Sequence, residues 1–322
     1  IDKISAGDTA WMLSSTALVL LMTIPGLALF YAGMVRKKNV LSTALQSFAI
    51  CALVTVVWVV IGYSLAFTAG STPYLGGFSR LFLEGMTFDK VQGLISVSHV
   101  APTIPESVLV MFQMTFAIIT PALITGAFAE RMRFSALVVF MVLWSIFVYA
   151  PVAHWVWEPS GWLATMGALD FAGGTVVHIN AGAAGLVCAY MLGKRQGYGR
   201  EPFFPNNLAF TLIGASLLWV GWFGFNVMSA QRVDAISGLV AINSLMAMVG
   251  GTLTANFMGK DDPGFLHNGP LAGLVAICAG SDIVHPIGAL LIGSAAGGMF
   301  VYLFTYTQNK LKIDDEIGRA HV

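Results

Sequence analysis

Long apolar stretches alternate with short polar breaks along almost the whole chain. A helix needs about 20 apolar residues to cross the roughly 30 Å hydrocarbon core of a bilayer. Segments of this kind predict nine transmembrane helices, at 10–34, 41–68, 107–129, 135–157, 170–193, 208–230, 236–258, 267–280 and 286–307. The eighth segment is short and interrupted by Gly and Pro, so it is the least regular. The pattern predicts an all-α fold, a polytopic transmembrane helical bundle.

Basic residues are unevenly divided between the breaks that join these segments. If the helices alternate in direction, eleven basic residues fall on one side and four on the other. The larger group contains Arg36, Lys37, Lys38, Arg131, Arg133, Lys194, Arg195, Arg200, Lys260, Lys310 and Lys312. The smaller group contains Lys3, Arg80, Lys90 and Arg232. Because cytoplasmic loops are enriched in Lys and Arg, the bias predicts a multi-pass protein of the cell (inner) membrane with its N-terminus outside.

Composition supports a lipid environment and argues against other classes of protein. Hydrophobic residues make up 57% of the chain and charged residues 10%, with a mean hydropathy of +0.79. A soluble domain usually carries roughly 25% charged residues. The formal net charge is zero, without the clustered basic surplus of a nucleic-acid binder. Cys51, Cys188 and Cys278 lie in apolar segments and fit neither a disulfide framework nor metal-ligand spacing.

Sequence motifs of the common enzyme classes are absent. The chain contains no nucleotide-binding P-loop, no H-E-x-x-H, no G-x-S-x-G and no dinucleotide-binding fingerprint. The sequence therefore predicts a protein that is not an enzyme and uses no cofactor or metal. The paired acids at 261–262 and 314–315 are interpreted as solvated loop residues.

Small residues recur within several predicted helices. Gly293 and Gly297 form a G-x-x-x-G pattern, and five more small residues line the fifth segment: Gly173, Gly174, Ala181, Gly182 and Gly185. In a bilayer, small residues allow helix backbones to approach closely. These positions predict tight helix packing.

His178 is the clearest candidate for a functional residue. It lies near the middle of the fifth segment, and ionisable groups within a membrane are costly and usually functional. Every neighbour on its helical face is Gly or Ala, which predicts that it points into a helix interface or a narrow lumen. A purely structural hydrogen bond between helices is the alternative. A proton or ligand site is favoured, because imidazole both donates and accepts hydrogen bonds.

Asp170 begins the same segment and is predicted to cap its N-terminus by accepting free backbone N–H groups. A carboxylate near the outer mouth would also attract a cation, and the two roles are compatible. Aromatic residues are dense at the outer ends of segments, at Tyr149, Trp155, Trp157 and Trp162. Most are interpreted as an interfacial belt, while one or two would suit a cation–π site for a small ammonium ion.

Several sequence blocks resemble the Amt/Rh ammonium transporter family, and more closely its Amt branch. The most specific is Asp170-Phe-Ala-Gly-Gly-Thr-Val-Val-His178-Ile-Asn-Ala-Gly-Ala-Ala-Gly-Leu, which continues to Gly193-Lys-Arg195. Further blocks are 22–31, 126–135 and Gly221-Trp-Phe-Gly-Phe-Asn226. The resemblance extends over about residues 8–315.

The resemblance implies a homotrimer of eleven-helix protomers, each with its own pore. It also implies roles for individual residues. Phe116 and Phe225 are similar to the stacked phenyl gate. Trp157 and Ser229, with Phe112 beside them, are similar to the external ammonium-recruitment site, which Asp170 would order. His178 resembles the first of two pore histidines, with Val177 and Phe171 near the path.

The implied activity is ammonium or ammonia transport across the lipid bilayer. Since ammonium and potassium ions have similar size and charge, selectivity would come from hydrogen bonding and loss of a proton. Ammonium would be recruited outside, deprotonated, and passed as ammonia through a hydrophobic pore. Alternatives are an ammonium sensor signalling to a cytoplasmic partner, for which a PII-type signalling protein is a candidate, and an Rh-type gas channel.

The resemblance stops after Asp315. The sequence then reads Glu316-Ile-Gly-Arg-Ala-His-Val322 where the family continues into a tenth helix with a second pore histidine, and then an eleventh. His321 lacks the matching context and is not assigned to that role. We interpret residues 1–315 as an Amt-type transport domain without its last two helices, and 316–322 as a non-native tail.

Overall fold

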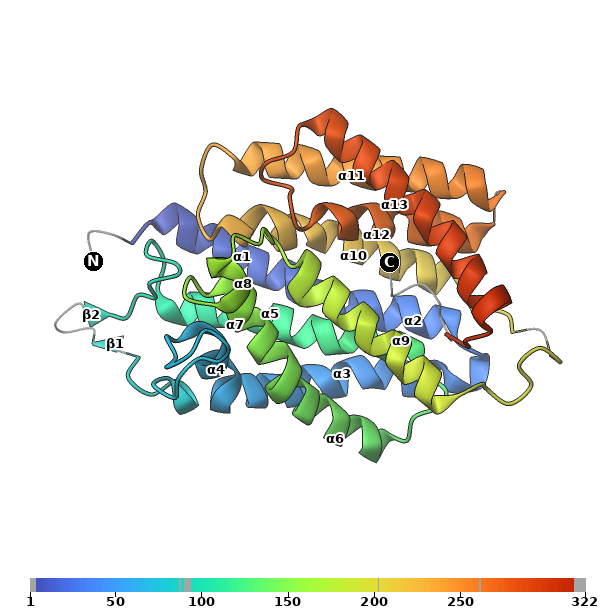
Figure 1. The fold of residues 1–322 in the computed structure, drawn as a ribbon, viewed down its shortest axis with the longest axis horizontal. Helices are drawn as coiled ribbons and strands as arrows, with labels where there is room; N and C mark the ends of the chain where they lie inside the picture. Colours follow the sequence, from blue (N-terminus) through green and yellow to red (C-terminus); the bar gives the residue numbers. More distant parts are fainter. Residues whose placement is uncertain (1–3, 87, 90–93, 202, 261, 316–322) are drawn as a thin grey trace.

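The computed structural model describes residues 4–86, 88–89, 94–201, 203–260 and 262–315. The described chain is almost entirely helical, and its long helices lie roughly side by side along the longest axis of the molecule (Figure 1). Within these described ranges, eight helical stretches are long and apolar enough to cross a membrane. This arrangement confirms the predicted all-α transmembrane bundle.

Several crossings are built from two helices joined by a short π or 3-10 turn. The first half of the chain contains α1 (Ala6–Leu21), α2 (Ala28–Met34), α3 (Val40–Val57), α4 (Tyr63–Phe67), β1 (Phe88–Asp89), β2 (Leu94–Ile95), α5 (Glu106–Ile124), α6 (Phe134–Trp144), α7 (Ala150–Trp157) and α8 (Trp162–Thr165). The second half contains α9 (Asn180–Leu192), α10 (Leu208–Val227), α11 (Ser237–Gly259), α12 (Pro263–Ile277) and α13 (Pro286–Tyr306).

Eight of the nine predicted segments correspond to these long stretches, and the segment at 267–280 differs. It forms α12, which has only 15 residues and runs from Pro263 to Ile277 before a turn. Pro263 occupies the first turn, where its missing N–H is tolerated, and the Asp262 carboxylate accepts the N–H of Gly264 at 2.7 Å. The helix therefore begins earlier and ends earlier than the hydrophobic pattern indicates.

The two ends of the bundle differ in charge. The end near β1 and β2, which we call the hairpin end, carries the N-terminus and the turns near 160, 232 and 282 (Figure 1). The opposite end, which we call the basic end, gathers the segments near 36, 131, 195 and 314, as their mutual hydrogen bonds show. All eleven residues of the larger basic group lie in segments at this end. The structure thus reproduces the alternation of helices that the charge bias predicted.

Close backbone packing joins α11, α12 and α13. A Cβ atom placed at Gly297 would lie 2.9 Å from Cα of Gly251, and one placed at Gly273 would lie 2.7 Å from the carbonyl carbon of Ala247. Real Cβ atoms do not approach that closely, so glycine is required for these helices to pack at this distance. The predicted role of the Gly293–Gly297 pattern in tight helix packing is confirmed.

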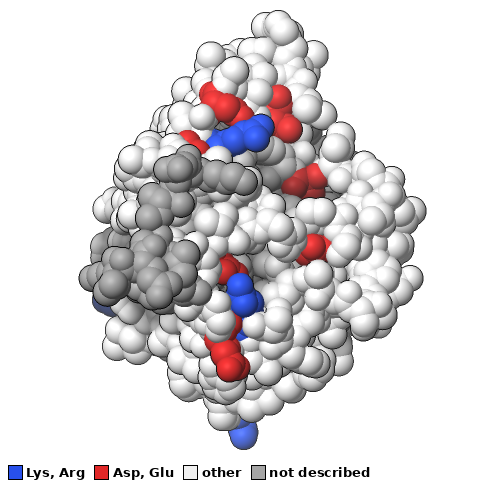
Figure 2. Space-filling model, turned by 90° about the vertical axis from the view of Figure 1, so that its left-hand side faces the viewer, with Lys and Arg blue, Asp and Glu red and all other residues white. Residues whose placement is uncertain are grey.

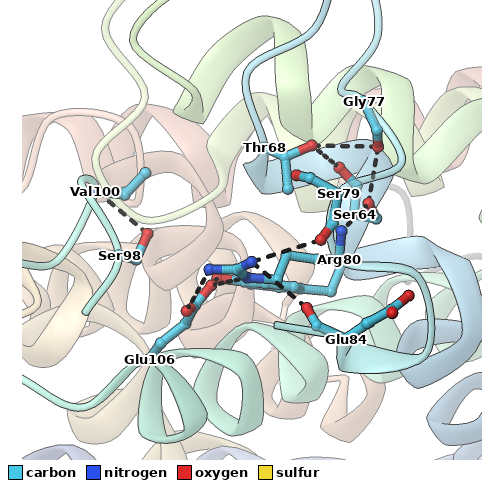
Figure 3. A network of polar contacts seen from close by, with 10 residues as sticks. Ser64, Thr68, Gly77, Ser79, Arg80, Glu84, Ser98, Val100 and Glu106 are labelled. Carbon is cyan, nitrogen blue, oxygen red and sulfur yellow. Dashed lines mark hydrogen bonds and ion pairs between the residues drawn. The ribbon is translucent and has the colours of Figure 1, made fainter. Parts of the chain in front are cut away.

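A buried ion pair fixes the start of α5 at the hairpin end. The guanidinium of Arg80 donates to both carboxylate oxygens of Glu106, at 2.9 and 3.2 Å, as Figure 3 shows. The backbone N–H of Arg80 donates to the hydroxyl of Ser64 at 3.0 Å, and the hydroxyl of Tyr63 donates to Glu106 at 3.1 Å. The network ties α4, the loop around Arg80 and α5 together.

Two ion pairs fix the basic end. Arg195 donates to both oxygens of Asp314, with the shortest side-chain distance 2.8 Å, and Arg36 is paired with Glu130. Asp314 is 1% exposed, so its interpretation as a solvated loop residue is wrong. The carboxylate is buried because it packs against the guanidinium of Arg195, which lies in the segment after α9.

Candidate functional site

Two of the expected recruitment residues, Trp157 and Ser229, lie near the hairpin end, and each is joined to the ring pair of Phe116 and Phe225. Trp157 ends α7 and is half-buried, with its indole N–H donating to the carbonyl oxygen of Asp170 at 2.8 Å. Ser229 follows α10 and is also half-buried. Its hydroxyl donates to the carbonyl oxygen of Phe225 at 2.6 Å, which leaves the oxygen lone pairs free to accept from a solute.

Asp170 acts as a cap for the helix that carries His178. Its carboxylate accepts four backbone N–H groups, those of Gly173, Gly174, Thr175 and Val176, at 2.6–3.0 Å. These groups are the otherwise unpaired donors at the helix start. The predicted capping role is confirmed. Because both oxygens are occupied by backbone donors, Asp170 orders the mouth from behind rather than presenting a free carboxylate to a cation.

A pair of phenyl rings lies below the mouth. Phe116 of α5 and Phe225 of α10 have ring centroids 4.3 Å apart with planes at 32°, and both side chains are fully buried. Phe116 also contacts Trp157 edge-on at 5.7 Å and Phe112 at 5.0 Å. The two phenyl rings therefore separate the mouth from the residues beneath it, and the atoms that they place there are aromatic carbons.

His178 lies directly beneath the phenyl pair. Its imidazole centroid is 5.7 Å from that of Phe225, and it stacks on Trp222 at 5.5 Å with planes at 16°. Nε2 is buried and has no hydrogen-bond partner within the described part of the chain. We call the row formed by Trp157, Phe116, Phe225, Trp222 and His178 the aromatic passage.

A narrow cavity begins at His178 and extends toward the basic end. No charged side chain lines it; its wall consists of Leu27, Phe30, Tyr31, Ile119, Leu123, His178, Leu218, Trp222, Leu271 and Val275. The buried face of α9 continues from His178 through Ala181 and Gly185, as the sequence predicted. His178 therefore faces a lumen and not lipid.

Two of the three residues expected along the pore path, Val177 and Phe171, do not line this cavity. Val177 is fully buried, and Phe171 is half-buried near the mouth, where its N–H donates to the carbonyl oxygen of Ala279 at 3.0 Å. The sequence analysis assigned no role to Trp222 or to Tyr31. Both line the cavity. Both also lie in sequence blocks that carry the family resemblance, and this resemblance is the signal that could have identified them. The chain supplies no cluster of metal ligands among the residues that the structure describes.

The surface of the hairpin end is sparsely charged. Figure 2 looks onto this end and shows scattered acidic side chains, some beside basic ones. Arg232 pairs with Asp234 at 2.7 Å, and His99 lies 2.9 Å from Glu158, the residue after Trp157. The Arg232 hydrogen bond lowers the pKa of Asp234, so that carboxylate is ionised at neutral pH. Negatively charged groups therefore lie near the mouth, but none of the residues that form the aromatic passage is acidic.

Comparison with known proteins places these features in one family. The model of the Ammonium Transporter Family matches residues 10–322. An ammonium transporter of Bacillus subtilis is 46% identical over 316 residues, covering 97% of this chain and 75% of that protein. An ammonium transporter of Aquifex aeolicus is 43% identical, covering 98% of this chain and 73% of that protein.

Solved structures agree with the sequence relatives. The crystal structure of Saccharomyces cerevisiae Mep2 superposes with a TM-score of 0.87 at 31% identity, over 99% of this chain and 71% of that chain. A structure described as a sensor Amt protein superposes with a TM-score of 0.87 at 29% identity, over 98% of this chain and 77% of that chain. The chain is a multi-pass membrane protein that belongs to the ammonium transporter family.

Proposed function

We propose that this chain transports ammonium across a membrane, with ammonium recruited at the hairpin end, deprotonated, and passed as ammonia along the aromatic passage. The observation that carries the proposal is the imidazole of His178, whose Nε2 is buried without a partner immediately behind a closed phenyl pair. An unpaired polar atom in an apolar setting is costly. Such an atom suits a solute that forms its hydrogen bonds only in passing.

Recruitment is assigned to Trp157 and Ser229, with Phe112 and Asp170 supporting them. The half-buried indole of Trp157 offers a cation–π face, and the Ser229 oxygen accepts an N–H. Together they replace part of the hydration shell of ammonium. A gas channel for a neutral solute would need neither group, so these residues favour a charged substrate.

The phenyl pair and cavity then select against ions. A bare cation crossing between Phe116 and Phe225 would lose its water with no charged or polar group in the ring pair to replace it. Neutral ammonia has a far smaller desolvation penalty and can donate to or accept from His178. Transfer of the ammonium proton to water above the rings therefore separates ammonium from potassium, whose ion has no proton to lose.

We further propose how the chain is organised in the membrane. The hairpin end faces outside and the basic end the cytoplasm of a cell (inner) membrane, because the eleven-to-four division of basic residues follows the positive-inside rule. Residues 1–315 form the transport domain of a homotrimer, and a PII-type protein is the candidate partner at the basic end. The proposed tail at 316–322 lies outside the described residues.

The test is ammonium transport by the purified protein in liposomes. An inward ammonium gradient should produce a saturable current or a change in internal pH, while an equal potassium gradient should not. His178→Ala should reduce the ammonium response at least tenfold, because it removes the imidazole that faces the cavity. Equal responses to ammonium and potassium in the parent protein would refute the proposal.

A control separates loss of function from loss of structure. Tyr190→Ala changes a ring on α9 that is 75% exposed and lies on the face turned away from the lumen. This variant should transport like the parent. If both variants lose transport equally, the effect of His178→Ala would reflect damage to α9 and not the chemistry of the imidazole.

A further inference from the structure

Cys278 lies at the end of α12, directly behind the wall of the cavity, and is fully buried. Its sulfur accepts the indole N–H of Trp222 at 3.3 Å. Its thiol proton has two acceptors within reach, Oδ1 of Asn226 at 3.4 Å and the carbonyl oxygen of Leu274 at 3.1 Å. The sulfur is therefore both an acceptor and a donor inside the bundle.

The hydrogen bonds continue away from the cavity. Nδ2 of Asn226 donates to the hydroxyl oxygen of Ser244 at 2.9 Å, and that hydroxyl donates to the carbonyl oxygen of Val240 at 2.8 Å. The series begins on the indole of Trp222, passes through α12 and ends on the backbone of α11. Since each donor in it has an acceptor, the series satisfies a buried polar network that would otherwise be costly.

Cys278 also holds the segment that carries His178. Its backbone carbonyl oxygen accepts the N–H of Ala172 at 2.9 Å, two residues after the capping carboxylate of Asp170. The same residue thus contacts Trp222 through its side chain and, through its backbone, the segment that leads into the helix of His178.

The direction of the indole N–H matters for the passage. The ring of Trp222 lines the cavity and stacks on His178, whereas its N–H is engaged by a residue that does not line the cavity. If the indole turned, its N–H would become a hydrogen-bond donor in an otherwise apolar lumen. Such a donor would bind water or ammonia and would no longer hold the ring flat against the imidazole.

We propose that Cys278 is a positioning residue for the passage: its thiol holds the indole of Trp222 flat against His178 and keeps the indole N–H out of the lumen. Serine at position 278 would keep an acceptor and a donor there. Alanine and valine would keep neither, and valine would also fill the volume of the thiol. The predicted effect on transport rests on the proposed function, whereas the predicted effect on the hydrogen bond of the indole does not.

The first experiment measures the indole directly. Ultraviolet resonance Raman spectra report whether an indole N–H is hydrogen-bonded, and the difference between the parent and Trp222→Phe isolates the signal of Trp222. In Cys278→Ala and Cys278→Val this signal should move to the position of an N–H without a protein acceptor. In Cys278→Ser it should stay hydrogen-bonded. An unchanged Trp222 signal in both apolar variants would overturn the proposal.

The second experiment measures ammonium transport by the same proteins in liposomes. The apolar variants should transport about fivefold more slowly, as expected from the loss of one buried hydrogen bond. Cys278→Ser should stay within about twofold of the parent by the same argument. Cys51→Ala is the matched control, because that half-buried cysteine on α3 lies outside the network.

The two experiments separate this proposal from the proposed function. If the parent itself fails to transport ammonium, the proposed function fails, and the Raman signal still decides whether Cys278 holds the indole. If the apolar variants show the Raman change but transport like the parent, indole orientation does not govern passage and the positioning role is overturned. Should alanine prevent folding, the valine variant gives the same decision.

Discussion

The aromatic passage and the basic end are both buried, but the passage leads into an apolar cavity, whereas the basic end is held together by ion pairs. The cavity below the passage has no charged residue in its wall, and the only polar side chains there are His178, Trp222 and Tyr31. At the basic end, Arg195–Asp314 and Arg36–Glu130 are ion pairs. The ring of Phe203 lies between these pairs, 4.3 Å from the guanidinium of Arg195 and 5.0 Å from that of Arg36.

The difference shows what each region must do. A paired charge holds two segments in one arrangement but would trap or repel an ion that passes it. The chain therefore uses ion pairs where segments must be fixed, and rings with one buried imidazole along the route that we propose for the solute. Asp170 fits this division, because its carboxylate is fully used by four backbone N–H groups at the start of the passage.

The largest effect should come from breaking a buried ion pair. Asp314→Ala leaves the guanidinium of Arg195 buried without its carboxylate, and the free energy of unfolding should fall by about 3 kcal/mol. Equilibrium unfolding of the detergent-solubilised protein measures this loss. Asp234→Ala, at an exposed ion pair, is the control and should cost about 0.5 kcal/mol. Equal losses in the two variants would contradict the division between the regions.

A smaller effect should follow from replacing one ring of the phenyl pair with a smaller side chain. Phe225→Val removes a ring that lies 4.3 Å from Phe116, so an ion would meet a shorter apolar barrier. We expect potassium flux relative to ammonium flux to rise about tenfold, equivalent to about 1.4 kcal/mol of barrier. Liposome flux assays with each ion measure the ratio.

The matched control for the phenyl pair is Phe223→Val, two residues earlier on α10 and half-buried. That ring makes no contact with the gate among the described ring pairs, so its removal should leave the flux ratio unchanged. A rise in potassium flux in both variants would mean that α10 loosened as a whole. A rise in neither would mean that the rings do not form the barrier.

The sequence predicted the passage better than it predicted the basic end. The hydrophobic pattern located eight crossings and the small face around His178, because lipid and close helix packing both impose residue types at fixed spacing. The capping role of Asp170 followed from its place before a helix. In contrast, nothing local indicated that Asp314 pairs with Arg195, 119 residues away, or that Cys278 meets Trp222 from another helix. Such contacts depend on how helices are arranged in space, which a pattern along one helix does not specify.

A still smaller effect should follow from removing the hydroxyl at the mouth. Ser229→Ala deletes an oxygen that can accept one N–H of ammonium, so the half-saturating ammonium concentration should rise about fivefold, or about 1 kcal/mol. The maximal rate should change little, because the phenyl pair and His178 are untouched. Ser216→Ala removes an exposed hydroxyl on α10, the helix before Ser229, that donates to the carbonyl oxygen of Leu212, and it should leave both quantities unchanged. A lower maximal rate without a change in half-saturation would assign Ser229 to passage and not to recruitment.

The smallest effect should appear as a pH dependence of stability at the basic end. Burial alone would raise the pKa of Glu130, but hydrogen bonds from Arg36 and Asn39 outweigh it and lower that pKa from 4.5 to about 2. A lowered carboxyl pKa stabilises the fold above the unfolded pKa, and this stabilisation is lost as the pH falls from about 4.5 toward 2. Between pH 6 and pH 4 the contribution of Glu130 should therefore fall by about 0.8 kcal/mol. The measurement compares unfolding of the parent with that of Glu130→Gln at both pH values, since other carboxylates titrate equally in the two proteins. The same loss in the parent and in the variant would show that the pair with Arg36 does not hold the carboxylate ionised, and the basic end would then depend on Arg195–Asp314 alone.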